Sequence, residues 1–180
     1  MNIYVMRHGT TVWNEKGITQ GRTNNRLSKN GKLLTEKVAK ELKDVVFDVI
    51  ITSPLMRTVQ TANIINKYHK VKILKDDNLI EIDQGDFTGR SKNSLSKKEE
   101  ILKSKRAKSA GMESYEECFI RVQKFLNTIK NNYNYDCVLI VTHNCVATFV
   151  EDIVTNKNAD FKEDRFLRNF NNVEVKKFVI

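Results

Sequence analysis

The sequence predicts an α/β fold: a mostly parallel central sheet with helices on both faces, and one small insertion. Short, apolar, β-prone segments alternate with helical patterns along the chain, and that alternation is typical of parallel β-α-β units. Residues 137–142 (CVLIVT) are almost continuously apolar, as a strand covered on both faces should be. The 180 residues can form one domain with a sizeable core. We therefore expect a single domain over residues 1–180, with a short basic insertion at about 90–113.

The first predicted elements are two strands with a helix between them. Residues 2–6 (NIYVM) form a short apolar, β-prone run. Residues 28–46 carry apolar side chains at helical spacing, and Ser28 is placed to act as the N-cap of that helix. The β-branched run 48–52 (DVIIT) predicts the next strand.

A second helix and a third strand follow. In the pair Ser53-Pro54, the serine resembles an N-cap and the proline suits the first helical position. The pattern predicts a helix from there to about Tyr68. Residues 71–74 then predict a short strand.

The last third of the chain repeats the alternation. Ser114 and Glu117 have the spacing of a capping box, and an apolar helical face follows them. After the apolar run 137–142, we expect a helix over about 144–154. Residues 173–180 (VEVKKFVI) predict a final strand.

One segment interrupts this pattern. Residues 91–110 contain seven Lys or Arg against two Glu and offer few apolar side chains to bury. Such a charge run is typical of an exposed helical or loose excursion. The functional alternative is a basic flap over a site that accepts anions.

Five polar side chains fall at or just beyond the carboxyl ends of predicted strands. His8 follows the first strand, next to Arg7, and His143 follows 137–142. Arg57 lies one helical turn after the strand ending near residue 52, and Glu81 follows the pair Leu79-Ile80. Because the carboxyl ends of parallel strands share one edge of the sheet, we expect these side chains to meet in one pocket.

Each of these residues alone is more often structural, but together their types suit phosphoryl transfer. A neutral imidazole can attack phosphorus, arginines can hold phosphoryl oxygens, and a carboxylic acid can protonate the leaving oxygen. Metal binding is the competing interpretation. The third histidine, His69, is expected at the surface, and two histidines without further ligands at the right spacing make a poor metal site.

Composition narrows the partners. The chain has 31 Lys and Arg against 22 Asp and Glu, a net charge of +9, which favours phosphorylated metabolites, nucleic acid or an acidic membrane surface. The alternative interpretation is that this net charge only keeps the protein surface soluble. We see no membrane-spanning run and no nucleic-acid-binding motif. Three scattered cysteines, expected to be buried, favour a reduced, cytoplasmic protein: Cys118, Cys137 and Cys145.

Five motifs, in order along the chain, resemble those of one known family. They are RHGTTVWN (7–14), SPLMRTVQTA (53–62), LIEIDQGDFTG (79–89), GMES (111–114) and VTHNCV (141–146). The set is similar to that of the histidine phosphatase superfamily, the phosphoglycerate mutase-like proteins. This resemblance covers the whole chain and implies a three-layer sandwich.

The resemblance also implies roles for individual residues. His8 would be the nucleophile that carries a phosphohistidine, and Glu81 would protonate the leaving group and then activate water. Arg7, Arg57 and His143 would form the phosphate pocket. Substrate contacts would come from Arg7, Arg57, Gly9, Thr10, Asn14, Gln20, Gly21 and Asn144. The family needs no metal or other cofactor for the transfer.

The sequence departs from the family at three positions. Asn24 stands where an acidic residue is usual, Arg26 stands where a proline is usual, and Asn144 replaces the glycine that commonly follows the second histidine. The five central polar side chains are all present. These departures therefore put the pocket's backbone geometry in question rather than its chemistry.

We expect a phosphomonoesterase acting on a small anionic substrate, in a monomer or homodimer without membrane attachment. The alternatives are a phosphoglycerate mutase and, less favoured, a protein that binds anions or nucleic acid without catalysis. Only residues 90–113 are available for the insertion that is large and basic in family mutases, which favours the phosphatase. Neutral His8 beside cations and protonated Glu81 beside a phosphate predict a bell-shaped pH profile.

Overall fold

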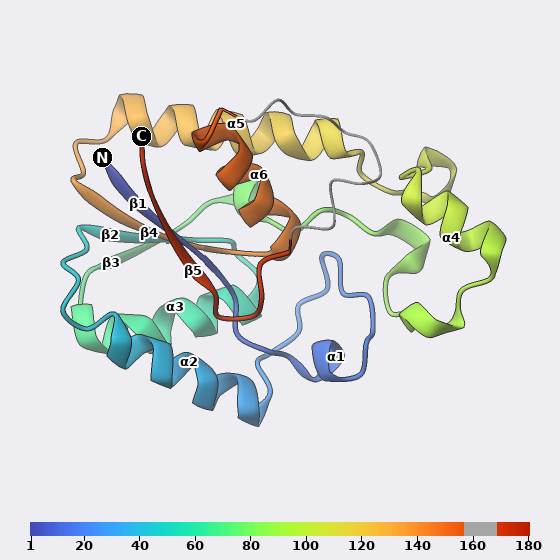
Figure 1. Ribbon diagram of the computed structural model, residues 1–180, viewed down its shortest axis with the longest axis horizontal. Coiled ribbons are helices and arrows are strands. Elements are labelled where there is room, and N and C mark those ends of the chain that lie inside the picture. Colours follow the sequence, from blue (N-terminus) through green and yellow to red (C-terminus); the bar gives the residue numbers. More distant parts are fainter. Residues whose placement is uncertain (157–168) are drawn as a thin grey trace.

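The computed structural model describes residues 1–156 and 169–180. In this part of the chain, five strands form one sheet in the order β3-β2-β4-β1-β5, flanked by helices (Figure 1). Four strands are parallel, and β5 runs antiparallel to β1 at the edge. Their bounds are β1 Asn2–Arg7, β2 Val49–Thr52, β3 Lys72–Lys75, β4 Cys137–Thr142 and β5 Val175–Val179. The predicted α/β fold with a mostly parallel sheet is confirmed.

Helices cover both faces of the sheet and make a three-layer arrangement (Figure 1). On one face lie α2 (Lys29–Glu41) and α3 (Met56–His69), and on the other α5 (Tyr115–Asn132) and α6 (Asn144–Val154). Alternate residues of β4 serve the two cores. Val138 and Ile140 pack toward α5 and α6, whereas Leu139 and Val141 pack toward α2 and α3. This double burial explains the continuous apolar run in the sequence.

The predicted caps are correct at two helices and wrong at one. Ser28 accepts the Gly31 N–H at α2, and Ser114 caps α5 with Glu117 in a capping box. The helix expected from Ser53 begins instead at Met56, behind an N-cap residue without a side-chain bond.

The start of α3 is satisfied from elsewhere in the chain. The Met56 N–H donates to the side-chain oxygen of Asn24 at 2.7 Å. The Ser53 hydroxyl instead forms a hydrogen bond with His143 Nε2, at 2.8 Å. Asn24 therefore supplies an acceptor for a helix N–H, a role that the usual acidic residue would fill equally well.

Three smaller expectations also need correction. Glu81 does not follow a strand: a 3₁₀ turn at Asp77–Leu79 precedes it, and residues 81–84 have no regular structure. His69 is half-buried rather than exposed, with its ring 4.8 Å from that of Phe47. Of the cysteines, all free, Cys137 is only partly buried.

The basic segment 91–110 is an excursion, partly helical, at one end of the molecule (Figure 1). It contains α4 (Lys97–Ser104), capped by Ser96 and Glu99. Contrary to expectation, it finds apolar partners. Leu95 and Leu102 pack on a small separate cluster of Phe87, Ala110 and Met112, so the segment has its own anchoring core.

The described residues contain no helix that is both long and apolar enough to cross a bilayer.

The short helix α1 (Val12–Glu15) was not predicted by the sequence patterns. Its N-cap is Thr11, which forms a capping box with Asn14.

Candidate active site

The two histidines that follow β1 and β4 face each other across one arginine. The ring centroids of His8 and His143 are 5.2 Å apart. Arg57, from the first turn of α3, places its Nε 3.2 Å from His8 Nε2 and 3.2 Å from His143 Nδ1. Because β1 and β4 are parallel neighbours, with Arg7 opposite Thr142 in the register, the residues following them leave the sheet at the same edge.

Hydrogen bonding assigns the proton on each imidazole. His8 Nδ1 lies 2.7 Å from the Gly9 carbonyl oxygen, which can only accept, so Nδ1 carries the proton and Nε2 keeps its lone pair. His143 Nδ1 accepts from Arg57, so its Nε2–H points to the Ser53 hydroxyl at 2.8 Å. His8 therefore presents an unprotonated nitrogen to the guanidinium.

Both imidazoles are held in the neutral form. Burial is the largest cause that lowers the pKa of His8 well below its usual range, followed by the charges of Arg57 and Arg7. Burial likewise lowers the pKa of His143, with Arg57 next. A neutral His8 is the nucleophilic form, whereas a neutral His143 contributes dipoles rather than a second positive charge.

Arg57 is fully buried but hydrogen-bonded only to neutral acceptors in the described structure. Besides the histidines, its Nη1 donates to the Thr23 carbonyl at 2.6 Å and its Nη2 to the Gly21 carbonyl at 2.8 Å. Burial lowers the pKa of Arg57 to about 10. Since no carboxylate among the described residues forms an ion pair with Arg57, its charge is available to an anion.

Arg7, the last residue of β1, adds a second cation. Its Nη1 donates to the Phe170 carbonyl at 2.5 Å, and its Nε, although buried, has no hydrogen-bond partner within the described residues. Burial lowers the pKa of Arg7, while Glu81 and Glu174 raise it. A buried, unpaired donor next to His8 is costly unless an acceptor arrives.

Glu81 supplies the carboxyl group of the site. Its Oε1 accepts the N–H of Ile82 at 3.0 Å. Burial raises the pKa of Glu81 above its usual range, although the Ile82 bond and the charges of Arg57, Arg7 and Arg121 oppose this. Even without a substrate, burial thus shifts the pKa of Glu81 in the direction that a proton donor needs.

These groups surround one cavity of about 330 Å³. Its lining includes eight residues singled out from the sequence: Arg7, His8, Asn14, Gln20, Gly21, Arg57, Glu81 and Asn144. His143, with no exposed surface, contacts the site through Arg57. Gly9 and Thr10 are outside the described lining, because the Gly9 N–H is turned to the Thr61 hydroxyl and the Thr10 carbonyl accepts from Ser28.

Two of the predicted substrate contacts also hold the surrounding loops. Asn14 Oδ1 accepts the Thr11 N–H, and the Asn144 amide bonds to the Phe170 N–H and to Asn169. Gly21 has a left-handed φ of 49°, which suits glycine and directs its carbonyl at Arg57.

Other lining residues escaped the sequence patterns. They include Ile18, Thr19, Ile82, Gln84, Tyr115 and Cys145, together with Lys103 and Arg106. Ile82, Gln84 and Cys145 lie inside the motifs 79–89 and 141–146, and Lys103 and Arg106 lie in the basic segment 91–110, but no pattern singled out any of them as a pocket residue. Across residues 1–156 and 169–180, no group of three or more His, Cys, Asp or Glu is arranged to hold a metal ion.

A sequence model of the histidine phosphatase superfamily (branch 1) matches residues 3–174. The chain belongs to this superfamily. As a superfamily member it is a phosphatase or a mutase. Bacillus stearothermophilus YhfR superposes with a TM-score of 0.86 at 23% identity, covering 98% of this chain and 89% of the other.

Curated relatives within the superfamily carry both kinds of name. "Uncharacterized phosphatase PhoE" of Bacillus subtilis is 33% identical over 143 residues, 78% of this chain and 70% of the relative. "Phosphoserine phosphatase 1" of Hydrogenobacter thermophilus is 30% identical over 149 residues, 79% and 71%. "Probable phosphoglycerate mutase GpmB" of Cronobacter sakazakii is 35% identical over 100 residues, 56% and 46%.

Proposed function

We propose that this protein is a metal-independent phosphomonoester hydrolase that works through a phosphohistidine on His8. One observation carries the proposal: the unprotonated Nε2 of His8 lies against a buried arginine in a cavity whose described lining has Glu81 as its one carboxyl group. Nucleophile, fixed positive charge and acid are thereby combined in one place.

In the first step, the phosphoryl oxygens lie against Arg7 and Arg57, and His8 Nε2 attacks phosphorus. The bond from phosphorus to the ester oxygen breaks, and Glu81 gives its proton to that oxygen. At present the Arg57 N–H occupies the His8 lone pair. A phosphoryl oxygen would accept that N–H instead, which frees the lone pair at the moment the substrate is bound.

In the second step, the Glu81 carboxylate takes a proton from a water molecule, and the water oxygen attacks phosphorus. The phosphorus–nitrogen bond breaks, inorganic phosphate leaves, and His8 and Glu81 return to their starting protonation states. Arg7 and Arg57 stabilise the charge on the phosphoryl oxygens in both steps.

The proposed substrate is a small phosphorylated metabolite with a second anionic group. Of the basic residues in 91–110, Lys103 and Arg106 line the cavity. Arg106 is bound to the Asp83 and Glu113 carbonyls and to Gln84. Lys103 Nζ donates to the Thr19 hydroxyl at 3.0 Å and lies over the Phe87 ring. We propose that Lys103, as a cation in the cavity lining, meets the second anion, such as the carboxylate that phosphoserine carries.

Three other arginines, close in sequence to the pocket residues, are engaged by protein groups. Arg22 binds the Glu81 carbonyl and Glu113. Arg90 pairs with Glu99 on α4, and Arg26 contacts Met56. A mutase remains the second candidate, favoured by the GpmB relatives.

Hydrolysis of p-nitrophenyl phosphate and of a panel of phosphorylated metabolites tests this proposal, with His8→Asn as the inactive control. We expect turnover that survives EDTA, release of inorganic phosphate, and an acid-labile phosphoryl group on the parent but not on His8→Asn. Phosphate moved between hydroxyls of one substrate without release would favour the mutase. Loss of all turnover with EDTA would contradict metal independence.

Some broader expectations accompany this proposal. We propose that residues 1–180 act as one domain with 90–113 as its insertion, in the cytoplasm, as a monomer or homodimer. Sedimentation at several concentrations tests the oligomeric state, and limited proteolysis tests whether the insertion is released before the rest.

A further inference from the structure

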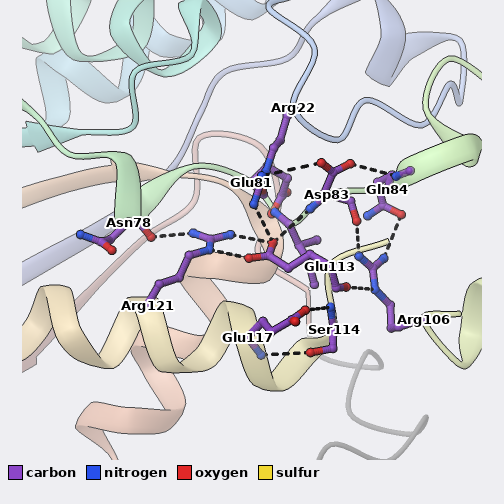
Figure 2. Close-up of polar contacts among 12 residues, drawn as sticks. Arg22, Asn78, Glu81, Asp83, Gln84, Arg106, Glu113, Ser114, Glu117 and Arg121 are labelled. Carbon is purple, nitrogen blue, oxygen red and sulfur yellow. Dashed lines mark hydrogen bonds and ion pairs between the residues drawn. The ribbon is translucent and has the colours of Figure 1, made fainter. Parts of the chain in front are cut away.

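The loop that carries Glu81 is held by side chains rather than by secondary structure (Figure 2). Residues 81–84 belong to no helix or strand. The Glu81 carbonyl accepts Arg22 Nε at 3.2 Å, and the Asp83 N–H donates to Glu113 Oε2 at 3.1 Å. The Asp83 carbonyl accepts Arg106 Nη2. Glu81 and the residues directly after it are therefore held by charged side chains from other segments.

Glu113 is the centre of this arrangement. Its Oε1 accepts Arg121 Nε at 2.8 Å, and its Oε2 lies 3.1 Å from both Arg121 Nη2 and Arg22 Nη2. Arg121 in turn donates to the Asn78 carbonyl at 2.6 Å, just ahead of the acid loop. Only 11% of the Glu113 side chain is exposed, so these contacts are shielded from solvent and strongly directional.

We propose that Glu113 is a positioning residue for Glu81: it clamps the acid loop through Asp83 and Arg22, and it sets the charge that the acid experiences. The inference rests on the proposed function, because it assigns Glu113 a role only if Glu81 acts as the proton donor. Glu113 itself is outside the described lining of the cavity.

The second part of the role is electrostatic. Arg57, Arg7 and Arg121 all act to lower the pKa of Glu81, and the Glu113 carboxylate neutralises the last of them. Around the same group lie Arg22, Asp83 on its own loop and Cys145 from α6. Removing the negative charge of Glu113 would leave Arg121 uncompensated and favour ionised Glu81.

A matched control lies one helical turn away. Glu117 also accepts a backbone N–H at the start of α5, from Ser114, and pairs with the basic residue Lys108. Its hydrogen bonds and ion pair within the described residues go to Ser114 and Lys108 rather than to residues 81–84, and its side chain is 49% exposed. Glu113→Gln and Glu117→Gln thus remove the same charge from the same helix start, and only the first touches the acid loop (Figure 2).

The first test compares leaving groups. A good leaving group such as p-nitrophenolate needs little protonation, whereas an alkoxide such as that of glycerol phosphate needs the acid. We expect Glu113→Gln to lower kcat/KM for glycerol phosphate by about tenfold to a hundredfold, with a much smaller loss for p-nitrophenyl phosphate. Glu117→Gln should lower both slightly and equally. Equal losses on both substrates in Glu113→Gln would overturn the proposal.

The second test is the pH profile of kcat/KM. Activity requires protonated Glu81, so its basic limb follows the pKa of that group. Glu113→Gln should move this limb to lower pH, while Glu117→Gln leaves it at the parent position. A purely structural role would lower the profile without displacing it, and that result would contradict the electrostatic part.

A third variant covers the case in which Glu113→Gln fails to fold. Arg22 is 38% exposed, so Arg22→Met should fold, which circular dichroism checks, and it removes the bond to the Glu81 carbonyl. We expect the same dependence on the leaving group. If it is absent, the clamp is refuted. A parent protein without phosphatase activity would instead refute the proposed function, so the two failures are distinguishable.

Discussion

The two sides of the cavity are built by different forces. On the histidine side, His8 and His143 directly follow strands β1 and β4, which share a buried ladder. On the acid side, Glu81 sits on a loop without regular structure, held by ion pairs around Glu113. The nucleophile is therefore placed by backbone hydrogen bonds and core packing, and the acid by charged side chains. Substitutions and pH should affect the two sides in different ways.

The largest expected effect is on the histidine side, at Arg57. Arg57→Lys keeps the charge but loses the planar fork that reaches two carbonyls and two imidazoles at once. We expect kcat/KM to fall on the order of a hundredfold to a thousandfold, as for loss of one donor that stabilises a transition state. Steady-state assays with p-nitrophenyl phosphate measure this, since the loss should not depend on the leaving group.

Inorganic phosphate gives the same prediction an independent readout. Bound phosphate should stabilise the parent by about 2.7 kcal/mol at a hundred times its Kd and thereby raise its Tm. The Tm of Arg57→Lys should rise far less. Arg90→Lys is the control, because Arg90 pairs with Glu99 on the basic segment. Unchanged phosphate stabilisation in Arg57→Lys would show that the buried charge does not face the anion.

The next prediction concerns stability against pH. In the folded protein, the pKa values of His8 and His143 lie well below 6.5. Below about pH 6.5, these histidines therefore bind protons in the unfolded chain but not in the folded one. Stability should therefore fall as pH drops from 7 to 5, by up to about 1.4 kcal/mol per pH unit for each histidine. Denaturant unfolding at several pH values measures the slope.

Glu81 contributes with the opposite sign. Its folded pKa is raised above 4.5, so its contribution is greatest at acid pH and is lost as pH rises through the folded value. His143→Asn should flatten the acid-side slope, and Glu81→Gln should steepen it. Identical slopes in the parent and His143→Asn would mean that this imidazole is not held neutral.

The same contrast explains what could be predicted from the sequence. Strands with buried faces on both sides leave a continuous apolar run, as in 137–142, and the residues that follow them are then placed by topology alone. His8, His143 and Arg57 were found in this way. Glu81 was found by position after an apolar pair, although a 3₁₀ turn rather than a strand precedes it.

Side-chain contacts between distant segments leave no such pattern. Ser53 matched the pattern of a helix N-cap, but its hydroxyl forms a hydrogen bond with His143, ninety positions away. Asn24 looked like a departure and proved to be the acceptor for the first N–H of α3. Likewise, nothing in GMES indicates that Glu113 joins Arg22 to Arg121. Such contacts depend on the finished fold, so local spacing could not predict them.

The smallest expected effect lies at the edge of the acid side, on α4. Lys103 lines the cavity, whereas Lys98 on the same helix is exposed and outside the described lining. A lysine near a second substrate anion at a partly solvated site is worth about 1 kcal/mol, or about fivefold in binding. Lys103→Met should raise KM by about that factor for phosphoserine or phosphoglycerate, and change KM for p-nitrophenyl phosphate little.

Lys98→Met provides the comparison, because it removes the same charge from the same helix without altering the cavity. It should leave the ratio of the two KM values at the parent level, and added salt should reduce the effect of Lys103→Met, since screening weakens a partly exposed contact. If both variants change the ratio alike, the basic segment acts through its overall charge. If only Lys103→Met does so, one side chain of the excursion sets the preference while the sheet edge supplies the chemistry.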